Sequence, residues 1–560
     1  MFLQRPPSFL LAIGLLALLP GRLAAQEDTF VEKVDVRVIN LEAVVEDAQG
    51  NRVHGLGIED FEILIDGKSH PVDYFSEIRG SQAVAAAPAP GAPEGSAAAA
   101  RPPALADDGR VPTSWVVFVD LALSDPRQIG LASERLIEQL GQLPPGDRVA
   151  LFAFDGRRLE NLADWGDRGE LLRTRLGSLE VMAHTGLREL NRLQASDALR
   201  DRTITNPGTG TGTQREADDP MYPASSIEDN ARQSARRLEA SLIAAATTMR
   251  TAEPPPGRRV FLNFAGAWPR DLAAYLGIPQ NAPDNLANRI RVFYPTQAYS
   301  GVYETANLLG YTIYSADLFI GRTTGGSTET RGVDASRAGL EGDFDRDFER
   351  DATLQRYAER TGGQAFTAGW TEASLAAVQE DVSAFYWLGF SAKRQGDDKE
   401  HKLEVRVKKP GLKVRSRKQF KDLSRKAEVE QELESRLLFS RTRSKEEFTV
   451  LAGEPSLKRS NMNVPITLRI PLDKVVFLPK GKNWAASLEL RVAALDVNGE
   501  RSPVPVIAIP LEGPQPQAGQ YATYETELRL RQRTRRLVLG LYDKTGDTLL
   551  TSTIDLENPR

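Results

Sequence analysis

Short apolar runs recur through the middle of the chain, and most end in a polar or small residue. They lie within the segments VVFVDLALSD (116–125), GDRVALFAFD (146–155), GRRVFLNFAGA (257–267), ANLLGYTIYSAD (306–317) and AERTGGQAF (358–366). Such runs, separated by helix-length segments, are typical of the buried strands of a doubly wound, mostly parallel α/β sheet. Ligands of such sheets bind beyond the carboxyl ends of the strands. Function is therefore expected at that edge, where Asp120 and Ser124 follow the first strand.

Alternating patterns flank this α/β domain, which we place at 113–392. The segment 28–78 contains two such stretches, the second folded around Asp66-Gly67, which predicts a hairpin. A β unit this small needs something to pack on. The following segment, 79–112, is dominated by Ala, Pro and Gly, and its composition predicts a flexible linker.

The C-terminal part divides into three further predicted regions. Residues 393–422 are expected to form a β-hairpin that closes the α/β domain, and residues 423–446 a charged, solvated connector helix. Short alternating strands separated by turn residues fill 447–558 and predict a β-sandwich. Within the α/β domain, residues 227–250 form an amphipathic helical pattern.

The first 25 residues have the pattern of a secretory signal peptide. Arg5 precedes an apolar run at 9–19, and small residues end at Ala25, the expected cleavage site. An uncleaved N-terminal anchor is the alternative. No other stretch approaches transmembrane length. We therefore expect an exported protein, periplasmic or extracellular, with no transmembrane segment in the mature chain.

Composition narrows the classes of function. The 560 residues include no cysteine, which excludes disulfides, thiol nucleophiles and thiolate metal sites. A net charge of −5 gives no reason to expect nucleic acid as a partner. A basic run at 406–425 alternates with apolar residues, which indicates the wet face of a hairpin, with an anionic surface as the alternative partner. Four residues of 385–390 are expected to be core aromatics rather than a sugar platform: Phe385, Tyr386, Trp387 and Phe390.

No catalytic constellation stands out in the sequence. The histidines are scattered and form no pair at metal-ligand spacing: His54, His70, His184 and His401. No nucleophile elbow, zinc-protease motif or phosphate-cradling loop is present. We therefore predict a protein that is not an enzyme. A hydrolase of envelope polymers remains an alternative, and it would require a buried acid pair that the sequence does not reveal.

Taken in order, several segments resemble the von Willebrand factor type A-related domain of exported bacterial proteins. They are GLGIEDF, DGK, ANLLGYTIY, TGGQAF and VRSRK, and with the strand segments they extend from Val36 to Phe420. The resemblance implies a metal-ion-dependent adhesion site at the carboxyl edge of the sheet. There Asp-x-Ser-x-Ser, a Thr and a late Asp would supply oxygen ligands to Mg²⁺ or Mn²⁺. A carboxylate of a protein partner would complete the coordination.

This sequence matches the implied ligand set in part. Asp120, Ser124 and Thr185 stand at three ligand positions, while Ala122 replaces the first Ser and Ala265 the late Asp. Fewer oxygens and less negative charge weaken a cation site, so we predict no cofactor and a metal-independent protein-binding function. A reduced Mg²⁺ or Mn²⁺ site, with Asp125 as a substitute ligand, is the alternative. Without a metal, Asp120 is expected to cap the helix that follows it.

Overall fold

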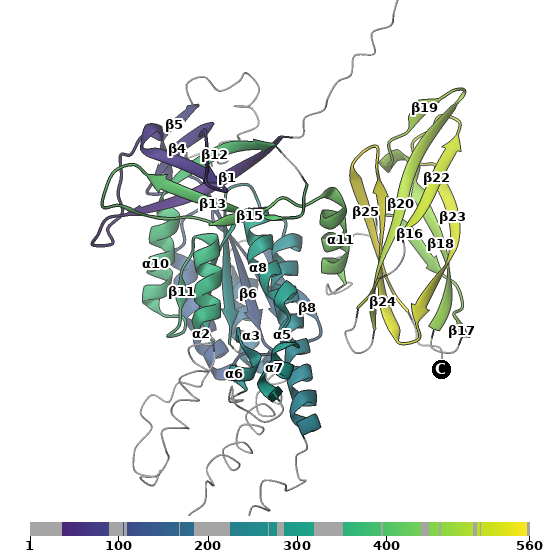
Figure 1. Cartoon of the computed structure of the whole chain (residues 1–560), viewed down its shortest axis with the longest axis horizontal. Coiled ribbons are helices and arrows are strands. Elements are labelled where there is room, and N and C mark those ends of the chain that lie inside the picture. The colour runs from purple at the N-terminus through teal and green to yellow at the C-terminus, as the bar shows by residue number, and fades with distance from the viewer. Residues whose placement is uncertain are drawn as a thin grey trace, which may run out of the picture.

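The chain forms an α/β unit, a β cap at one edge of its sheet, and a pair of β-sheets at the C-terminal end (Figure 1). The structure is a computed structural model. It describes residues 36–88, 105, 109–166, 169–183, 224–266, 268–276, 285–318, 351–393, 396–437, 447–458, 461–496, 501–503 and 506–556. The predicted signal peptide, with Ala25, lies outside this part of the chain.

The α/β unit contains one six-stranded sheet in the order β11-β10-β9-β6-β7-β8. Five strands are parallel: β6 (Thr113–Asp120), β7 (Arg148–Phe154), β9 (Arg258–Ala265), β10 (Tyr311–Asp317) and β11 (Ala365–Phe366). This confirms the predicted parallel α/β sheet. The sixth strand, β8 (Leu159–Gly166), is an edge strand antiparallel to β7 and was not predicted from the sequence. Its mixed polar and apolar residues leave it only partly buried, so it lacks the continuous apolar run of its neighbours.

Helices cover both faces of this sheet. One face packs on α2 (Pro126–Gln139), α3 (Glu170–Met182) and α10 (Glu372–Ser383). The other packs on α5 (Ala224–Thr251), α6 (Leu272–Tyr275), α7 (Leu286–Arg291) and α8 (Thr296–Leu309). Strand β6 serves both cores, because Trp115 and Val117 point to the first face while Val116 and Phe118 point to the second. The predicted amphipathic helix at 227–250 corresponds to α5.

The β cap combines strands from before and after the α/β unit. One sheet has the order β14 (Lys413–Arg415), β1 (Val36–Glu46), β12 (Ala384–Lys393), β4 (Tyr74–Arg79), β5 (Gln82–Pro88). The other has the order β15 (Gln419–Lys421), β13 (Glu400–Val407), β2 (Phe61–Ile65), β3 (Lys68–His70). Both sheets contribute to one apolar core.

This arrangement changes three predicted boundaries. The 28–78 unit and the 393–422 hairpin are parts of the same cap, and β12, from the predicted α/β domain, is a central strand of it. Strand β5 falls in the predicted linker and pairs with β4. The physical reason is that β1 and β4 do not pair with each other. Both pair with β12, whose aromatic residues are buried.

The turn predicted at Asp66-Gly67 is confirmed. It joins β2 and β3 with two residues whose φ angles are 49° and 80°. Two consecutive positive φ values are typical of a type I′ turn, whose twist matches that of the strands it connects.

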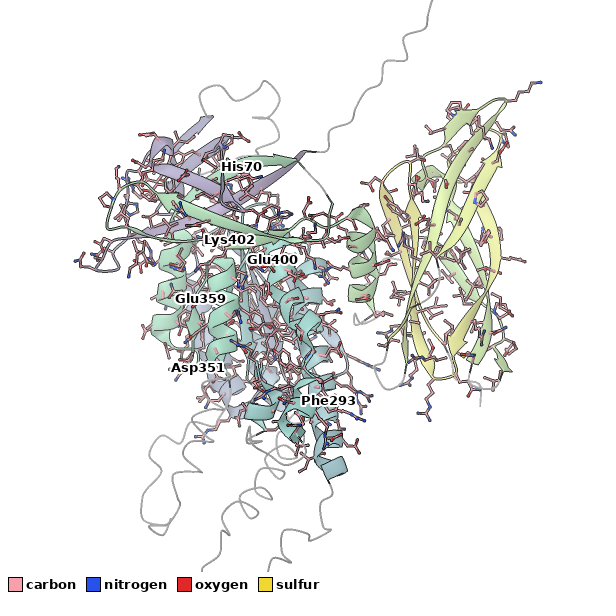
Figure 2. The ribbon with its side chains drawn as sticks, in the orientation of Figure 1. His70, Phe293, Asp351, Glu359, Glu400 and Lys402 are labelled. Atoms are coloured by element: carbon pink, nitrogen blue, oxygen red, sulfur yellow. The ribbon has the colours of Figure 1, made fainter. Side chains whose placement is uncertain are left out.

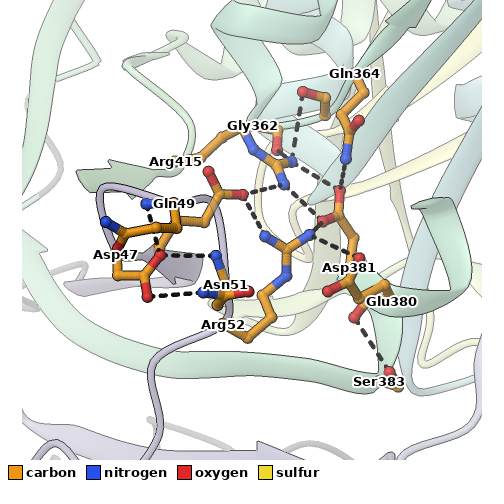
Figure 3. Close-up of polar contacts among 12 residues, drawn as sticks. Asp47, Gln49, Asn51, Arg52, Gly362, Gln364, Glu380, Asp381, Ser383 and Arg415 are labelled. Carbon is orange, nitrogen blue, oxygen red and sulfur yellow. Dashed lines mark hydrogen bonds and ion pairs between the residues drawn. The ribbon is translucent and has the colours of Figure 1, made fainter. Parts of the chain in front are cut away.

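A buried ionic cluster joins the cap to the amino end of the parallel strands (Figure 3). Asp381, at the end of α10, accepts hydrogen bonds on its carboxylate from Arg415 at 2.6 and 2.7 Å and from Arg52 at 2.6 Å. Gln364 and the Tyr314 hydroxyl donate to the same carboxylate. Arg52 and Arg415 come from the cap, whereas Tyr314 belongs to β10. The cluster therefore connects the cap to the α/β unit through buried charges.

A second ion pair extends this connection. Arg258, at the start of β9, is 1% exposed and lies 2.8 Å from Glu42 of β1. Its guanidinium also donates to the main-chain oxygen of Asp381. The Thr312 hydroxyl, on β10, donates to Glu42 at 3.0 Å. Two neighbouring parallel strands are thus fixed to one strand of the cap.

The C-terminal region contains two antiparallel sheets that share one apolar core. The first consists of β16 (Thr449–Ala452), β17 (Ser456–Lys458), β18 (Asn461–Pro471) and β23 (Tyr521–Arg531). The second consists of β19 (Leu478–Lys480), β20 (Asn483–Asp496), β21 (Arg501–Pro503), β22 (Ile507–Gly513), β24 (Thr534–Asp543) and β25 (Thr548–Asp555). Facing sheets of this kind agree with the predicted β-sandwich.

The helix α11 (Arg425–Arg436) stands between the α/β unit and these sheets (Figure 1). A solvated connector was predicted here, but Val429 and Leu433 are buried against the second sheet. On its other side, Gln431 accepts a hydrogen bond from Arg250 of α5 at 3.1 Å. The apolar face of this helix consists of only a few residues among many charged ones, so the sequence pattern did not predict it. Among the described residues, no helix has the length and apolarity required to cross a membrane.

The ionic cluster yields a stability prediction. Asp381→Asn leaves Arg52 and Arg415 short of a buried counter-charge and should lower the free energy of unfolding by about 3–5 kcal/mol at neutral pH. Burial raises the pKa of Asp381, but Arg415, Gln364 and Arg258 together lower it more, so the pKa lies below its usual value. This stabilisation is therefore present above about pH 4 and is lost as the pH falls through the folded-state pKa. Urea unfolding at several pH values measures it.

The neighbouring Glu380 provides the control. Its side chain is 56% exposed and lies 3.7 Å from Arg52, so Glu380→Gln should cost no more than about 1 kcal/mol. Equal losses in the two variants would contradict the role given to Asp381.

Candidate functional site at the carboxyl edge of the parallel sheet

The loops at the carboxyl edge of the sheet are joined by main-chain hydrogen bonds. Leu121, directly after β6, donates to the oxygen of Phe154 at the end of β7. Leu318, after β10, donates to Ala265 at the end of β9 and accepts from Asp125. The ends of four parallel strands are thus held together, and the first of these strands carries Asp120.

Asp120 lies beneath this edge and is fully buried. One carboxylate oxygen, Oδ1, accepts hydrogen bonds from the main-chain N–H groups of Ala122 at 3.0 Å and Leu123 at 3.3 Å. The other, Oδ2, accepts from the indole nitrogen of Trp268 at 2.7 Å. Trp268 is itself fully buried. Both oxygens therefore face N–H donors of the chain.

Burial raises the pKa of Asp120 above its usual value. The hydrogen bonds from Trp268 and from the two main-chain groups act in the opposite direction, but they do not cancel the loss of solvation. The carboxyl group of Asp120 therefore holds a proton more readily in this site than it would in water. A strong cation site requires the reverse preference.

The helix cap predicted for Asp120 belongs to another residue. Asp125 precedes Pro126, the first residue of α2, and its Oδ1 accepts from the main-chain N–H groups of Arg127 at 2.9 Å and Gln128 at 3.2 Å. The prediction that Asp120 caps this helix was therefore wrong, because the capping residue is Asp125, five positions later. Asp125 satisfies two of the free N–H groups of the first turn. This role also occupies the residue that was considered as a substitute metal ligand.

The remaining predicted ligand positions have different outcomes. Ser124 is buried, and its hydroxyl has no hydrogen-bond partner among the described residues. Ala122 and Ala265 are buried and offer no side-chain oxygen. Thr185 lies outside the part of the chain that the structure describes. The structure thus brings Asp120 and Ser124 to the same edge without an identified third ligand.

These residues do not fit a hexacoordinate Mg²⁺ or Mn²⁺. Such an ion needs open oxygen lone pairs, whereas the Trp268 N–H points at Oδ2 of Asp120, where an ion would bind. Space is also limited near Gly266, where a Cβ atom would come within 2.6 Å of the Leu123 oxygen. Admitting an ion would require the indole of Trp268 to move out of the core.

Four exposed arginines lie on segments next to this closed centre, and they were not predicted from the sequence. They are Arg127 at the start of α2, Arg157 and Arg158 in the turn between β7 and β8, and Arg270 two residues after Trp268. No ion pair joins their guanidinium groups to a carboxylate of the described residues. We define these four residues as the arginine rim. Because they come from three separate segments, they form no basic cluster that is visible in the sequence.

The turn that carries two of these arginines has a fixed shape. Asp155 accepts hydrogen bonds from the main-chain N–H groups of Arg157 and Arg158, each at 2.7 Å. Gly156 has a φ of 93°, and a Cβ there would lie 3.2 Å from the Cβ of Ala122. The turn is therefore pressed against the loop that follows Asp120.

The basic run at 406–425 agrees with the predicted wet face in its first part, where Arg406, Lys408, Lys409 and Lys413 are exposed, but three later members have another role. Arg415 belongs to the Asp381 cluster, and Arg417 donates to the Asn307 oxygen at 2.6 Å. Lys421 lies 3.0 Å from Glu304 of α8. These side chains connect the cap to the α/β unit instead of lining a wet face. The four aromatic residues of 385–390 are buried, as expected of core residues.

Comparison of this chain with protein-family models gives no match, and comparison with curated proteins gives no match either.

The closed carboxylate yields a pH-dependent prediction. Trp268→Phe removes the donor to Asp120 and should cost about 1–3 kcal/mol. Because the lost bond favours the ionised carboxyl, the variant raises the pKa of Asp120 further. A raised folded-state pKa makes stability fall as the pH rises through it, so the loss should be larger near about pH 8 than near about pH 4. Urea unfolding at the two pH values tests this.

Trp370→Phe is a matched control. Trp370 is equally buried, but its indole nitrogen donates to the neutral side chain of Gln139 at 2.9 Å. Its loss of stability should be similar at both pH values. A Trp268→Phe cost that does not vary with pH would contradict the charge-assisted bond to Asp120.

Proposed function

We propose that this protein is an exported protein-binding module that contacts another protein through the carboxyl edge of its parallel sheet, without a metal ion. The α/β unit would act as a von Willebrand factor A-like domain whose adhesion site no longer uses a cation. The partner would present an acidic surface to the arginine rim.

The observation that carries this proposal is the closed state of Asp120. A carboxylate with all its donors inside the protein and no exposed area cannot share an ion with a partner. It does hold the loops after β6 and β9 in fixed positions. This supports a role for Asp120 in shaping the edge, with contact made by other residues.

The arginine rim supports the choice of partner. Arginine is enriched at protein interfaces, and its planar guanidinium forms paired hydrogen bonds with carboxylates. Four exposed guanidinium groups without a carboxylate partner among the described residues provide the positive charge that a bound cation provides in a metal-dependent adhesion site. Their positions on turns fixed by Asp125 and Asp155 reduce the ordering that binding requires.

A metal-dependent version remains the second candidate, and one observation favours it. The buried Ser124 hydroxyl without a described partner is the kind of group that a ligand could satisfy. An enzymatic function has less support, because Asp120 has no surface through which a polymer substrate could reach it.

Melting curves with Mg²⁺, Mn²⁺ or Ca²⁺ against a chelator separate the two candidates. A cation at 100 times its Kd would add about 2.7 kcal/mol to the folded state and would raise Tm by on the order of 5 °C. We expect no cation to raise the Tm of the wild-type chain in a way that depends on Ser124 or Asp120. A shift lost in both variants would replace the proposed mechanism by the metal-dependent one.

Charge reversal tests the binding surface. Envelope proteins captured by the wild-type chain are first identified, and their association rates with Arg157→Glu/Arg158→Glu are then measured. We expect a decrease of about tenfold or more and a weaker dependence on salt. Arg175→Glu, on the exposed side of α3, is the control and should leave the rates within about twofold. Unchanged binding in the rim variant would contradict the proposal.

A further inference from the structure

A histidine and two aspartates meet where the cap connects to α11. They are His401 on β13, Asp397 in the segment before β13, and Asp422 directly after β15. One ligand atom of each lies within 4.8 Å of the others. The labelled residues Glu400 and Lys402 mark this position on β13 (Figure 2). Asp422 is buried, whereas His401 and Asp397 remain partly accessible.

The imidazole of His401 is oriented by a fourth residue. Its Nδ1 lies 2.8 Å from Oδ2 of Asp66, and the other oxygen of Asp66 accepts from the main chain of Lys402 at 2.9 Å. The ring also stacks on Phe420, with the ring centres 5.3 Å apart. Metal-binding histidines characteristically donate their second ring nitrogen to such a carboxylate. This contact directs Nε2 toward Asp397 and Asp422.

The spacing at Nε2 suits coordination better than a direct hydrogen bond. Nε2 lies 3.3 Å from Oδ1 of Asp397, beyond the roughly 2.7–2.9 Å of a charge-assisted bond. Two ligands held about 2.0–2.2 Å from one tetrahedral ion are separated by roughly 3.4 Å. The shorter contact of His401 with Asp66, on the same ring, is within the charge-assisted range.

We propose that Asp397, His401 and Asp422 form a divalent metal site for Zn²⁺ or a similar first-row transition ion, with Asp66 orienting the imidazole. One nitrogen and two carboxylate oxygens form a mixed set that such ions accept and that Mg²⁺ and Ca²⁺, which prefer oxygen alone, accept less well. On binding, the ion takes the place of any proton on Nε2. Water completes the coordination on the accessible side.

The charges around the cluster are consistent with a cation. Four aspartates lie close to it, Asp66, Asp397, Asp398 and Asp422, with Lys68 and Lys402 near Asp66. Lys399 lies 3.6 Å from Oδ2 of Asp397 and is 76% exposed. Because that ammonium group is in solvent, it can move aside when an ion binds. The Oδ2 of Asp422 accepts a hydrogen bond from the Gly396 main chain at 2.9 Å, and carboxylates that coordinate a metal commonly keep such hydrogen bonds.

An ion at this place would fix the route from the cap to the C-terminal sheets. Asp422 precedes Ser424, whose main chain donates to Asp398 at 2.6 Å, and α11 begins at Arg425. The ion would therefore join the start of β13 to the segment that leads into α11. This role is independent of the carboxyl edge and of the function proposed for it.

The test uses the whole mature chain, freed of metal by a chelator. Addition of Zn²⁺ should raise Tm by about 5 °C or more at saturation, and one equivalent of Co²⁺ should develop visible absorption. His401→Gln and Asp397→Asn should each abolish both signals. Asp66→Asn should keep them at about 10–100-fold lower affinity, a result that a purely structural His401 would not give.

His54→Gln is the matched control, since His54 also contacts one carboxylate, that of Glu77 at 3.2 Å, but belongs to no such cluster. It should leave metal binding unchanged. The proposal is overturned if Zn²⁺ and Co²⁺ give no signal, or if the signals persist in both His401→Gln and Asp397→Asn. If one of these variants does not fold, Asp422→Asn takes its place with the same expected loss.

Discussion

The buried carboxylate of Asp381 is the constraint on which the arrangement of the cap and the α/β unit depends. It brings the guanidinium groups of Arg52 and Arg415 to the amino end of the parallel strands, where Tyr314 and Gln364 complete its hydrogen bonds. Buried charges tolerate little displacement, because each must keep its partners to offset lost solvation. Apolar contacts alone would allow the cap to slide. The ionic cluster fixes its position.

The two ends of the parallel sheet are therefore used differently. At the amino end, charges are paired internally and the surface is covered by the cap. At the carboxyl end, the fully buried carboxylate of Asp120 is enclosed by Trp268 and the main chain, and the arginine rim is exposed. This asymmetry is the reason for placing the proposed binding surface at the carboxyl end. It also separates the residues that shape this face from those that would contact a partner.

The sequence was sufficient to predict elements whose local pattern is strong. The parallel strands, the Asp66-Gly67 turn, helix α5 and the C-terminal strands follow from apolar runs, alternation and turn residues. It was insufficient where the partner of a residue is distant in the chain. Neither the position of β12 between β1 and β4 nor the contact of Trp268 with Asp120 leaves a periodic signal. Likewise, Asp125 and Asp120 precede the same helix, and only the geometry shows which one caps it.

The interleaved order of the cap strands has a consequence for folding. Ala43 of β1 pairs with Tyr386 of β12, so nearly the whole α/β unit must be synthesised between two directly paired residues. Such distant pairing closes a very long loop and slows the search for the native topology. The α/β unit can form its own core first, while β1 and β4 still have unpaired edges. The cap can therefore form only after β12 has been synthesised. Until then, the unpaired edges of β1 and β4 are the places where two incompletely folded chains would associate wrongly.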